Sequence, residues 1–502
     1  MLNLPCSDKI EAVKKFEEVG FVPVKRPDLD PFVINLPFDW SIDPYNDENW
    51  KFQLHTLRYL MVYLEAYICT GSEKYADRLI EYILDWHEFV TKRSCDYAWH
   101  DMATGIRSEK LYLIYSRLTN DGYTKTDLLK PVVNKHLSVL KKTGFFNPSH
   151  NHGMYVLHGL RCLAEVIEFE EYESIKEYCE KSWRTLIDNQ LDANFVHKEH
   201  SPHYHFLFID SLKRYVNSGL YEDFSYLKET LIRAEQNSEM FLLPDGREVP
   251  FGDTDNAECI GIEKRAGKIE KDELVLYSKS GYVLCKGRAK NSSFLAFTNT
   301  YHSKIHKHWD NLSLIWGERG QDILVDPGKY KYASDVIRKK VISSGAHNTI
   351  NFVEEEWSGG NLVPPCEEVE VLKTGDGIAL LSSIRIKRKK KEFKFERRVN
   401  YSPGKLVVFD KVSPESGEKV CSRFNLHKSA RLISFREGIF VFDCMGVLVK
   451  IEAFAFLQGK RKTVMPIIEQ VPVSYKYGSY ENCVSLVVCF VNSVEVSFEI
   501  TE

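Results

Sequence analysis

The hydrophobic residues of this chain change their spacing once, and that change limits the fold more than any other feature. From about Asp47 to about Met240, apolar residues recur every three or four positions, which is the period of an amphipathic helix. Beyond Leu274 they lie in short alternating runs rich in β-branched residues, such as 405–410, which is typical of strands. The sequence therefore predicts a helical region followed by a β region, with the boundary between about Gly246 and Leu274.

The length of the chain predicts more than one domain. Its 502 residues exceed what one hydrophobic core usually organises. Helical hairpins in series favour an α/α toroid or solenoid, and the number of strands favours one large antiparallel sandwich. We predict an α+β multidomain protein, with an incomplete α/α toroid followed by a β-sandwich. The predicted limits are an N-terminal extension packing on the toroid over 1–45, the toroid over 46–255, and the sandwich, with a metal site, over 256–502.

The charge balance narrows the choice of partner. The formal net charge of −4 at pH 7 gives no overall attraction for polyanions, so nucleic acid is not an expected partner. An anionic substrate has to be held by a local basic site instead. The cationic run 385–398 fits either a solvated hairpin or a grip for a uronate-rich polymer. The sequence leaves the oligomeric state open, a homodimer included.

The cysteines and the first residues favour a cytoplasmic protein. The 12 cysteines are scattered and none forms a CxxC pair, which is typical of reduced thiols and not of a disulfide framework. Residues 1–20 carry charges throughout and lack the apolar stretch of a signal peptide. No apolar run reaches the length of a membrane span. We expect a cytoplasmic location, or a periplasmic or secreted one if a leader has been removed.

A histidine-rich segment early in the predicted sandwich carries the strongest chemical signal. Residues 306–310 have the pattern HxHxD, and Asp326 and His347 follow. Together they offer enough nitrogen and oxygen to bind a zinc ion, with one histidine left for chemistry. The alternative for the same residues is a hydrogen-bonded cluster without a metal.

The helical region carries three polar groups of residues that helix packing does not require. Taken singly, Asn151 fits a helix cap and Tyr204 fits a core tyrosine. It is their combination that points to a site. The three groups are Asn151-His152-Gly153, the run from Glu199 to His205, and Pro244 to Gly246 with Gly252 to Asn256.

The order of these motifs, together with 346–348, resembles the heparinase II/III family of polysaccharide lyases. The similarity runs from about Trp40 to about Tyr401 and includes Trp99 and Arg107. It implies the same toroid and sandwich, and a lyase activity on an anionic polysaccharide or oligosaccharide. It also implies a zinc ion, or another divalent metal, in a structural role. Residues after 401 match nothing in the family pattern.

The resemblance also implies roles for individual residues. Tyr204 matches the catalytic tyrosine and His306 matches a catalytic histidine. Asn151 matches the asparagine that binds the uronate carboxyl group, with His152 beside it. The expected metal ligands are His308, Asp326 and His347, and the further residues expected at the substrate are Trp99, Arg107, Glu199, His205 and Asn348.

These residue types suit β-elimination at a 4-linked uronic acid. A lyase removes the proton at C5 and expels the oxygen at C4, and negative charge builds up on the neighbouring carboxyl group. Asn151 and His152 can hydrogen-bond that group, and one lost donor at such a site costs about 2–4 kcal/mol of barrier. Neutral Tyr204 suits proton donation to the leaving oxygen, and neutral His306 suits a base. The sequence does not decide which of the two takes the proton.

Two other functions use the same residues. A uronyl C5-epimerase shares the first proton abstraction and then returns a proton to the opposite face of C5. A non-catalytic polysaccharide-binding or assembly protein, in a capsule or exopolysaccharide pathway, would keep the site without turnover. The motifs alone do not separate these alternatives from a lyase.

Overall fold

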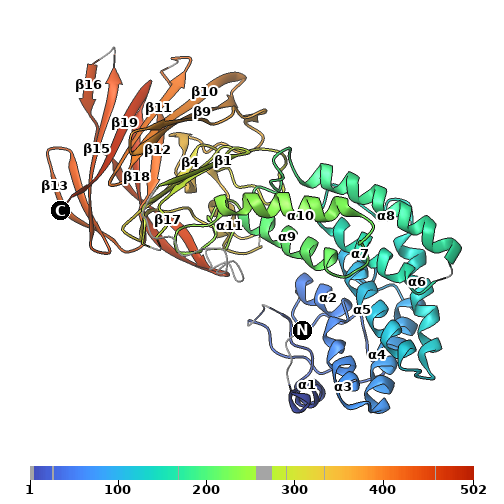
Figure 1. Ribbon diagram of the computed structural model, residues 1–502. Helices are drawn as coiled ribbons and strands as arrows, with labels where there is room; N and C mark the ends of the chain where they lie inside the picture. The colour runs from blue at the N-terminus through green and yellow to red at the C-terminus, as the bar shows by residue number, and fades with distance from the viewer. Residues whose placement is uncertain are drawn as a thin grey trace. The chain divides into compact units, whose positions relative to one another are not determined.

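The chain folds into a helical unit followed by a unit that contains the strands (Figure 1). The computed structural model describes residues 5–24, 26, 28–167, 169–255, 274–289, 291–332, 334–415, 417–457 and 460–501. The first unit comprises Met1–Gln190 and Ser211–Lys228, and the second comprises Leu191–Asp210 and Glu229–Glu502. The predicted order, with a helical region before an antiparallel β region, is confirmed.

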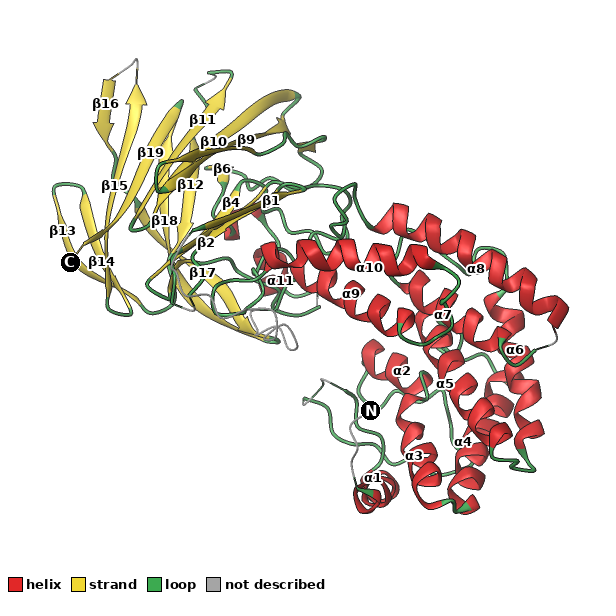
Figure 2. Ribbon diagram, in the orientation of Figure 1, coloured by secondary structure: helices red, strands yellow, loops and turns green. Residues whose placement is uncertain are grey.

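The helices before residue 238 follow one another along the chain (Figure 2). Most bury one face because their apolar residues recur at helical spacing, whereas the helix His152–Ala164 is buried all round from Gly153 onward. In α4, for example, Tyr75, Leu79, Ile83, Trp86 and Val90 are all buried. The α-helices are α1 (Cys6–Val19), α2 (Glu48–His55), α3 (Met61–Thr70), α4 (Glu73–Lys92), α5 (Asp101–Asn120), α6 (Lys130–Leu140), α7 (His152–Ala164), α8 (Phe169–Gln190), α9 (Pro202–Val216) and α10 (Ser225–Asn237).

Helices α5 and α7 touch through two glycines. A Cβ atom placed on Gly105 would lie 2.3 Å from the Tyr155 carbonyl oxygen, and one placed on Gly159 would lie 2.6 Å from the Gly105 carbonyl oxygen. Both neighbours are backbone atoms, which cannot move aside as a flexible side chain can. The two glycines therefore fix how closely the first turns of these helices approach one another.

The segment before α2 packs on the helices of the first unit. The ring of Phe16 lies 5.8 Å from the rings of both Tyr63 and Tyr82. Cys6 and Cys69 form a disulfide, with their Cα atoms 5.6 Å apart, that joins α1 to α3. The expectation that the cysteines are reduced thiols is therefore wrong for this pair, because folding brings together two cysteines that are 63 residues apart in the sequence.

The strands form antiparallel sheets throughout the described residues. A five-stranded sheet has the order β1-β2-β3-β4-β5, a four-stranded sheet has the order β17-β18-β12-β6, and a ten-stranded sheet contains the rest. The strands are β1 (Val275–Lys279), β2 (Tyr282–Lys286), β3 (Phe294–Thr298), β4 (Ser313–Glu318), β5 (Gln321–Leu324), β6 (Ile350–Phe352), β7 (Leu362–Val363), β8 (Glu370–Thr374), β9 (Gly377–Arg388), β10 (Lys391–Ser402), β11 (Lys405–Ser413), β12 (Val420–Asn425), β13 (Ala430–Arg436), β14 (Ile439–Cys444), β15 (Val447–Leu457), β16 (Lys460–Thr463), β17 (Ile467–Lys476), β18 (Ser479–Phe490) and β19 (Ser493–Thr501).

One hydrophobic core joins the three sheets into a sandwich. Trp316 of the five-stranded sheet, Phe498 of the ten-stranded sheet and Phe424 of the four-stranded sheet are fully buried in the same cluster. The ring of Phe498 lies 6.1 Å from that of Trp316 and 5.1 Å from that of Phe424. The strands β3, β5 and β6, which border the loops described below, therefore pack in the same core.

The cationic run 385–398 forms the β9–β10 hairpin, and its last part enters the core. Arg397 is fully buried and bonds both oxygens of Asp410 at 2.7 Å. It also donates to the carbonyl oxygens of Leu312 and Asn348. One buried guanidinium thus ties the loop after residue 306 to the segment that contains His347.

The packing groups two helical-region segments with the strands. Phe206, Phe241 and Phe251 share a buried cluster with Tyr282 and Phe294. Segments 191–210 and 229–255 therefore belong to the second unit, although their spacing is helical or irregular. The predicted boundary at residue 256 borders 256–273, which lie outside the described residues, so the predicted domain limits stay a prediction. Among the described residues, no helix is long and apolar enough to cross a membrane.

Candidate active site

The HxHxD segment lies in the loop between β3 and β4, and its backbone is tightly held. His306 has φ of 52°, in the left-handed region that non-glycine residues rarely adopt. Gly252 approaches it so closely that a Cβ atom there would lie 3.0 Å from the His306 carbonyl oxygen and 2.3 Å from that of His200. The Asp253 amide donates to the same His306 carbonyl at 3.2 Å. Gly252 and Asp253 thus hold the backbone of His306 in one position.

Tyr204 and His306, both predicted as catalytic from the family resemblance, lie in contact. Tyr204 is in the first turn of α9, and its ring stacks on that of His306 with centroids 3.5 Å apart and an interplanar angle of 15°. Tyr332 joins them: its hydroxyl lies 2.6 Å from the Tyr204 hydroxyl and 3.2 Å from His306 Nδ1. The Tyr332 hydroxyl therefore connects the two residues that were predicted as catalytic.

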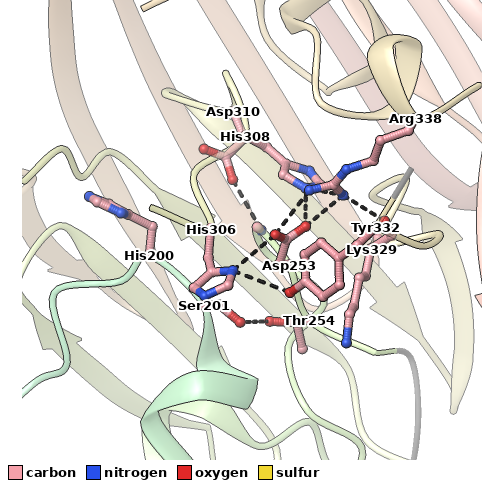
Figure 3. Close-up of polar contacts among 12 residues, drawn as sticks. His200, Ser201, Asp253, Thr254, His306, His308, Asp310, Lys329, Tyr332 and Arg338 are labelled. Carbon is pink, nitrogen blue, oxygen red and sulfur yellow. Dashed lines mark hydrogen bonds and ion pairs between the residues drawn. The ribbon is translucent and has the colours of Figure 1, made fainter. Parts of the chain in front are cut away.

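Two buried carboxylates flank the ring of His306. Asp253 Oδ2 lies 3.1 Å from Nδ1, and Glu199 Oε2 lies 3.5 Å from Nε2. Figure 3 shows Asp253 at the centre of the polar contacts, reached by His306, His308 and Arg338. The imidazole of His306 therefore lies between two carboxylate groups.

Arg338 fixes the charge state of Asp253. Its guanidinium lies 2.6 Å from Oδ1 and donates to Oδ2 at 3.0 Å. Burial opposes ionisation of this carboxyl, but its hydrogen bonds with His306, His308 and Arg338 outweigh burial and hold the pKa well below the usual range. Arg338 lies on the short helix α11 (Val336–Val341), and its backbone amide donates to the Asp335 side chain at 2.8 Å. Asp253 is therefore a fixed negative charge between two histidines.

Burial keeps Tyr204 protonated. It raises the pKa of this phenol well above its usual value; the hydrogen bond from Tyr332 opposes the rise, and the charges of Asp253 and Glu199 add to it. Burial likewise raises the pKa of Tyr332. Both hydroxyls are therefore proton donors near neutral pH, which suits Tyr204 for protonating a leaving oxygen.

The three predicted metal ligands come together behind this site. His308, Asp326 and His347 are buried, and one possible ligand atom from each lies within 4.8 Å of the others. His347 Nδ1 lies 2.8 Å from Asp326 Oδ2. His308 Nε2 lies 2.9 Å from Asp253 Oδ1, so Asp253 contacts both the catalytic candidate and a ligand candidate.

The triad fits a divalent metal. His308 Nδ1 and His347 Nε2 are buried and have no hydrogen-bond partner within the described part of the chain. A buried polar atom without a partner costs about 1–3 kcal/mol, and a bound cation would remove that cost. Burial also lowers the pKa of His308, which favours the neutral form that binds metals. Two imidazoles and a carboxylate are a donor set that zinc accepts.

Asn151 and His152 lie in the helical unit, at the start of α7. Asn151 is 8% exposed, and its Oδ1 has no hydrogen-bond partner in the described chain. His152 Nδ1 lies 2.9 Å from Asp101 Oδ1. Burial raises the pKa of this carboxyl, but the hydrogen bond and charge of His152 outweigh it and lower the pKa overall.

Arg107 and Trp99 make internal contacts in the helical unit. The guanidinium of Arg107 is buried, lies 4.1 Å from the ring of Trp86 and 5.3 Å from that of Trp99, and donates to His136 and to the Ala98 carbonyl. Its donors are thus used inside the protein. Its predicted part in substrate binding stays untested, and the contacts indicate support of the helix packing.

Three further predicted substrate residues are buried in the β unit. Asn348 donates to the carbonyls of Leu314 and Val325 and holds the strand ends together. His205 is 1% exposed and accepts a hydrogen bond from the His197 amide at 3.3 Å. Glu199 is the only one of these three that lies beside His306. The structure thus favours supporting roles for Asn348 and His205.

Sequence reasoning missed Tyr332 and Arg338. Both follow the Asp326-Pro327-Gly328 turn by several residues, in a stretch whose sequence has no periodic or motif signal. Asp253 was visible in the Gly252–Asn256 group, but its role as the bridge between His306 and His308 depends on the fold. The signal in the sequence was a carboxylate directly after a glycine, Gly252-Asp253.

Comparisons with known proteins identify the family and the fold. The family model "Heparinase II/III N-terminus" matches residues 13–256, and "Heparinase II/III-like, C-terminal" matches residues 270–496. A curated relative, the heparin-sulfate lyase of Pedobacter heparinus, is 21% identical over 333 residues, which are 59% of this chain and 50% of the relative. The chain thus spans half the length of that relative.

Solved structures share the whole fold at low sequence identity. The heparan sulfate lyase HepC of Pedobacter heparinus aligns with a TM-score of 0.75 at 17% identity, over 100% of this chain and 84% of that one. A heparinase III structure aligns with a TM-score of 0.77 at 16% identity, over 100% and 87%. These likenesses show an α/α toroid with a β-sandwich. Because two models of one family together match nearly the whole chain, the protein belongs to the heparinase II/III family.

Proposed function

We propose that the protein is a polysaccharide lyase that cleaves a uronic-acid-containing glycosaminoglycan by β-elimination. The observation that carries this proposal is the stacked pair of Tyr204 and His306, joined through the Tyr332 hydroxyl. The relatives with the same fold are lyases named for heparin and heparan sulfate, which supports a substrate of that class.

In the proposed reaction, His306 is the base and Tyr204 is the acid. The imidazole takes the C5 proton, the C4–O bond breaks as the C4–C5 double bond forms, and the Tyr204 hydroxyl gives its proton to the leaving oxygen. The raised pKa of Tyr204 supports this division, because a protonated phenol cannot act as the base. General acid–base catalysis of this kind contributes about 10²–10⁴-fold in rate.

Asp253 and Glu199 stabilise the charged intermediate form of His306. Once the imidazole holds the C5 proton, it is a cation between two carboxylates. Asp253 is itself held by Arg338, so it does not need to move or change its protonation. Stabilisation by preorganised charge is commonly the largest single contribution to catalysis.

Tyr332 completes the cycle of protons. After elimination, His306 carries one proton too many and Tyr204 carries one too few. The Tyr332 hydroxyl contacts both groups, so it can donate to Tyr204 while it accepts from His306. The net result is transfer of one proton from C5 to the leaving oxygen. Because Tyr332 contacts Nδ1, a C5 proton taken at Nε2 leaves the other tautomer of His306, and exchange of the imidazole proton with water restores the starting one.

A structural metal at His308, Asp326 and His347 belongs to the same proposal, with zinc as the ion that the donor set favours. When bound, the ion would crosslink the loops that follow β3, β5 and α11. We expect His347→Ala to lose this metal and to unfold at a lower temperature, because three ligands become two. Metal content and thermal unfolding check this, and equal metal content in the variant and the parent protein would refute the assignment.

The location of the protein also remains a proposal. Free thiols at the other described cysteines support the cytoplasm, whereas the Cys6–Cys69 disulfide is typical of an oxidising compartment. A part in a capsule or exopolysaccharide pathway fits either compartment. Fractionation of the source cells decides between the two.

A uronyl C5-epimerase is the second candidate, because it uses the same base. The experiment that separates them is incubation of defined uronate polymers in deuterated water, followed by mass spectrometry of the products. A lyase yields shorter chains with an unsaturated end, whereas an epimerase incorporates deuterium at C5 without cleavage. Intact polymer with or without deuterium would overturn the lyase assignment, and unmodified polymer throughout would favour a binding protein.

A further inference from the structure

The helical unit contains a second cluster of side chains that can ligate a metal. Asp101 Oδ1 lies 2.9 Å from His152 Nδ1 and 3.3 Å from His100 Nδ1. One possible ligand atom from each of the three residues lies within 4.8 Å of the others. The predicted catalytic role of His152 does not explain why His100 and Asp101 lie beside it.

The fold holds these three side chains together. His100 precedes α5 and Asp101 is its first residue, while His152 is the first residue of α7. The same two helices are in close backbone contact at Gly105 and Gly159. The geometry of the cluster therefore rests on backbone packing and not on flexible surface side chains.

One nitrogen of the cluster is left without a hydrogen bond. His100 Nδ1 is shielded from solvent and, among the described residues, has no hydrogen-bond partner, although Asp101 Oδ1 is 3.3 Å away. The ring is fixed in place, because it stacks on Tyr97 with centroids 5.2 Å apart and lies 5.3 Å from the ring of His152. A cation between the nitrogen and the carboxylate would satisfy both.

The spacing fits coordination. Zinc binds imidazole nitrogen and carboxylate oxygen at about 2.0–2.2 Å, so neighbouring ligands of a tetrahedral ion lie about 3.4 Å apart. The distances of 2.9 and 3.3 Å from Asp101 Oδ1 are close to this value. Each side chain is about a quarter to a third exposed, at 30% for His100, 30% for Asp101 and 25% for His152, so an ion can enter from solvent.

The helix dipoles oppose a cation here, but weakly. Both Asp101 and His152 lie in first turns, where the positive end of a helix disfavours positive charge, an effect that solvent screens at partly exposed side chains. A divalent ion held by three protein ligands gains direct coordination bonds, which are stronger than the interaction with the partial charges of a helix end. Coordination therefore outweighs the dipoles.

We propose that His100, Asp101 and His152 form a second cation site of this protein, for a divalent transition-metal ion such as Zn²⁺. Three protein ligands leave at least one position open. Asn151, whose buried Oδ1 lacks a partner in the described chain, precedes His152 directly in the sequence. The open position suits a carboxylate oxygen of an anionic sugar; this last step rests on the proposed function, whereas the metal site does not.

The test counts bound metal and needs no substrate. Metal-free protein is titrated with Zn²⁺ and with Co²⁺, by calorimetry and by the visible absorbance of cobalt. We expect two ions per chain in the parent protein, one in the His100→Ala/His152→Ala variant, and one in His347→Ala. His87→Ala, which removes a half-buried histidine of the same unit outside the cluster, is the control and keeps both ions.

Asp101→Asn tests the site even if the double variant does not fold, because asparagine keeps the shape of the aspartate side chain. It is expected to weaken the affinity of one ion by about tenfold or more, with helical content unchanged. Two ions retained in the double variant, or a parent protein whose metal is lost entirely on His347→Ala, would overturn the proposal. An unchanged affinity in Asp101→Asn would do the same. A lack of lyase activity would overturn only the proposed function.

Discussion

At the scale of single residues, the site depends on Asp253. This carboxylate contacts the catalytic candidate His306, the ligand candidate His308 and the cation of Arg338. No other described side chain contacts all three. It acts through these neighbours and not on the substrate, so it is a positioning residue.

We expect Asp253→Asn to lower kcat by about 100-fold or more with a smaller change in KM, because the neutral amide no longer stabilises a charged His306. Stability should fall as well, since Arg338 loses its partner, and breaking a buried pair costs about 3–5 kcal/mol. Steady-state kinetics and thermal unfolding measure the two effects.

Asp255→Asn is the matched control. Asp255 is two residues away, partly exposed, and paired with Lys329 at 3.4 Å. Asp255 is 33% exposed and makes one long contact, so kcat and stability should stay closer to those of the parent protein than they do in Asp253→Asn. Wild-type kcat in Asp253→Asn would remove it from the mechanism, and equal losses in both variants would point to a general effect of charge.

Single site residues could be predicted from the sequence where they belong to a recognisable motif. Tyr204, His306 and the three ligand candidates stand in recognisable patterns, and the structure brings them together as two groups. Tyr332 and Arg338 stand in no pattern, because their place beside His306 depends on how the loop after β5 packs. Arg107 and Asn348 were expected at the substrate because they match the family pattern, but their hydrogen bonds are internal.

At the scale of elements, the α5–α7 contact positions the first turn of α7. We expect Gly159→Ala to destabilise the protein by about 1–3 kcal/mol, because the added methyl group would lie 2.6 Å from the Gly105 carbonyl and neither backbone can give way. The KM for a uronate polymer should rise, since Asn151 and His152 move with the helix. Chemical denaturation and kinetics check the two expectations.

Gly360→Ala provides the comparison. Its nearest neighbour would be Ser358 Oγ at 3.8 Å, which is ordinary contact. This variant should unfold at the same denaturant concentration as the parent protein. If Gly159→Ala is equally stable, the glycine contact does not set the helix spacing.

Elements were the most predictable level of this fold. The change from a spacing of three or four to alternation located the helices and the strands, because burial of one face requires it in both cases. The Cys6–Cys69 pair was not predictable, since it depends on α1 folding back onto α3. Segments 191–210 and 229–255 were assigned by period to the helical domain, whereas their aromatic residues pack against the strands.

At the scale of the whole molecule, buried neutral histidines link stability to pH. Burial lowers the pKa of His158 in the helical unit and of His205 in the β unit from 6.5 to about 3. Between these values the unfolded chain binds a proton that the folded protein does not. Stability is therefore fully present above about pH 6.5 and declines as the pH falls toward 3.

We expect the urea concentration at the unfolding midpoint to be lower at about pH 5.5 than at about pH 7.5. Over this range the buried histidines gain protons only in the unfolded chain. In His158→Gln the pH dependence should be shallower, because one such group is gone. Equal midpoints at the two pH values would contradict the burial of neutral histidines.

The central claim is that the Tyr204–His306 pair performs β-elimination. The most direct measurement is the ultraviolet absorbance of the new C4–C5 double bond, recorded with a heparan-type uronate polymer and equal amounts of the parent protein and Tyr204→Phe. The account predicts that absorbance rises steadily with the parent protein and stays flat with the variant, while both proteins unfold at the same temperature and bind the polymer equally. A rise of equal rate with Tyr204→Phe would contradict it, as would the absence of any rise with the folded parent protein on every uronate polymer tried.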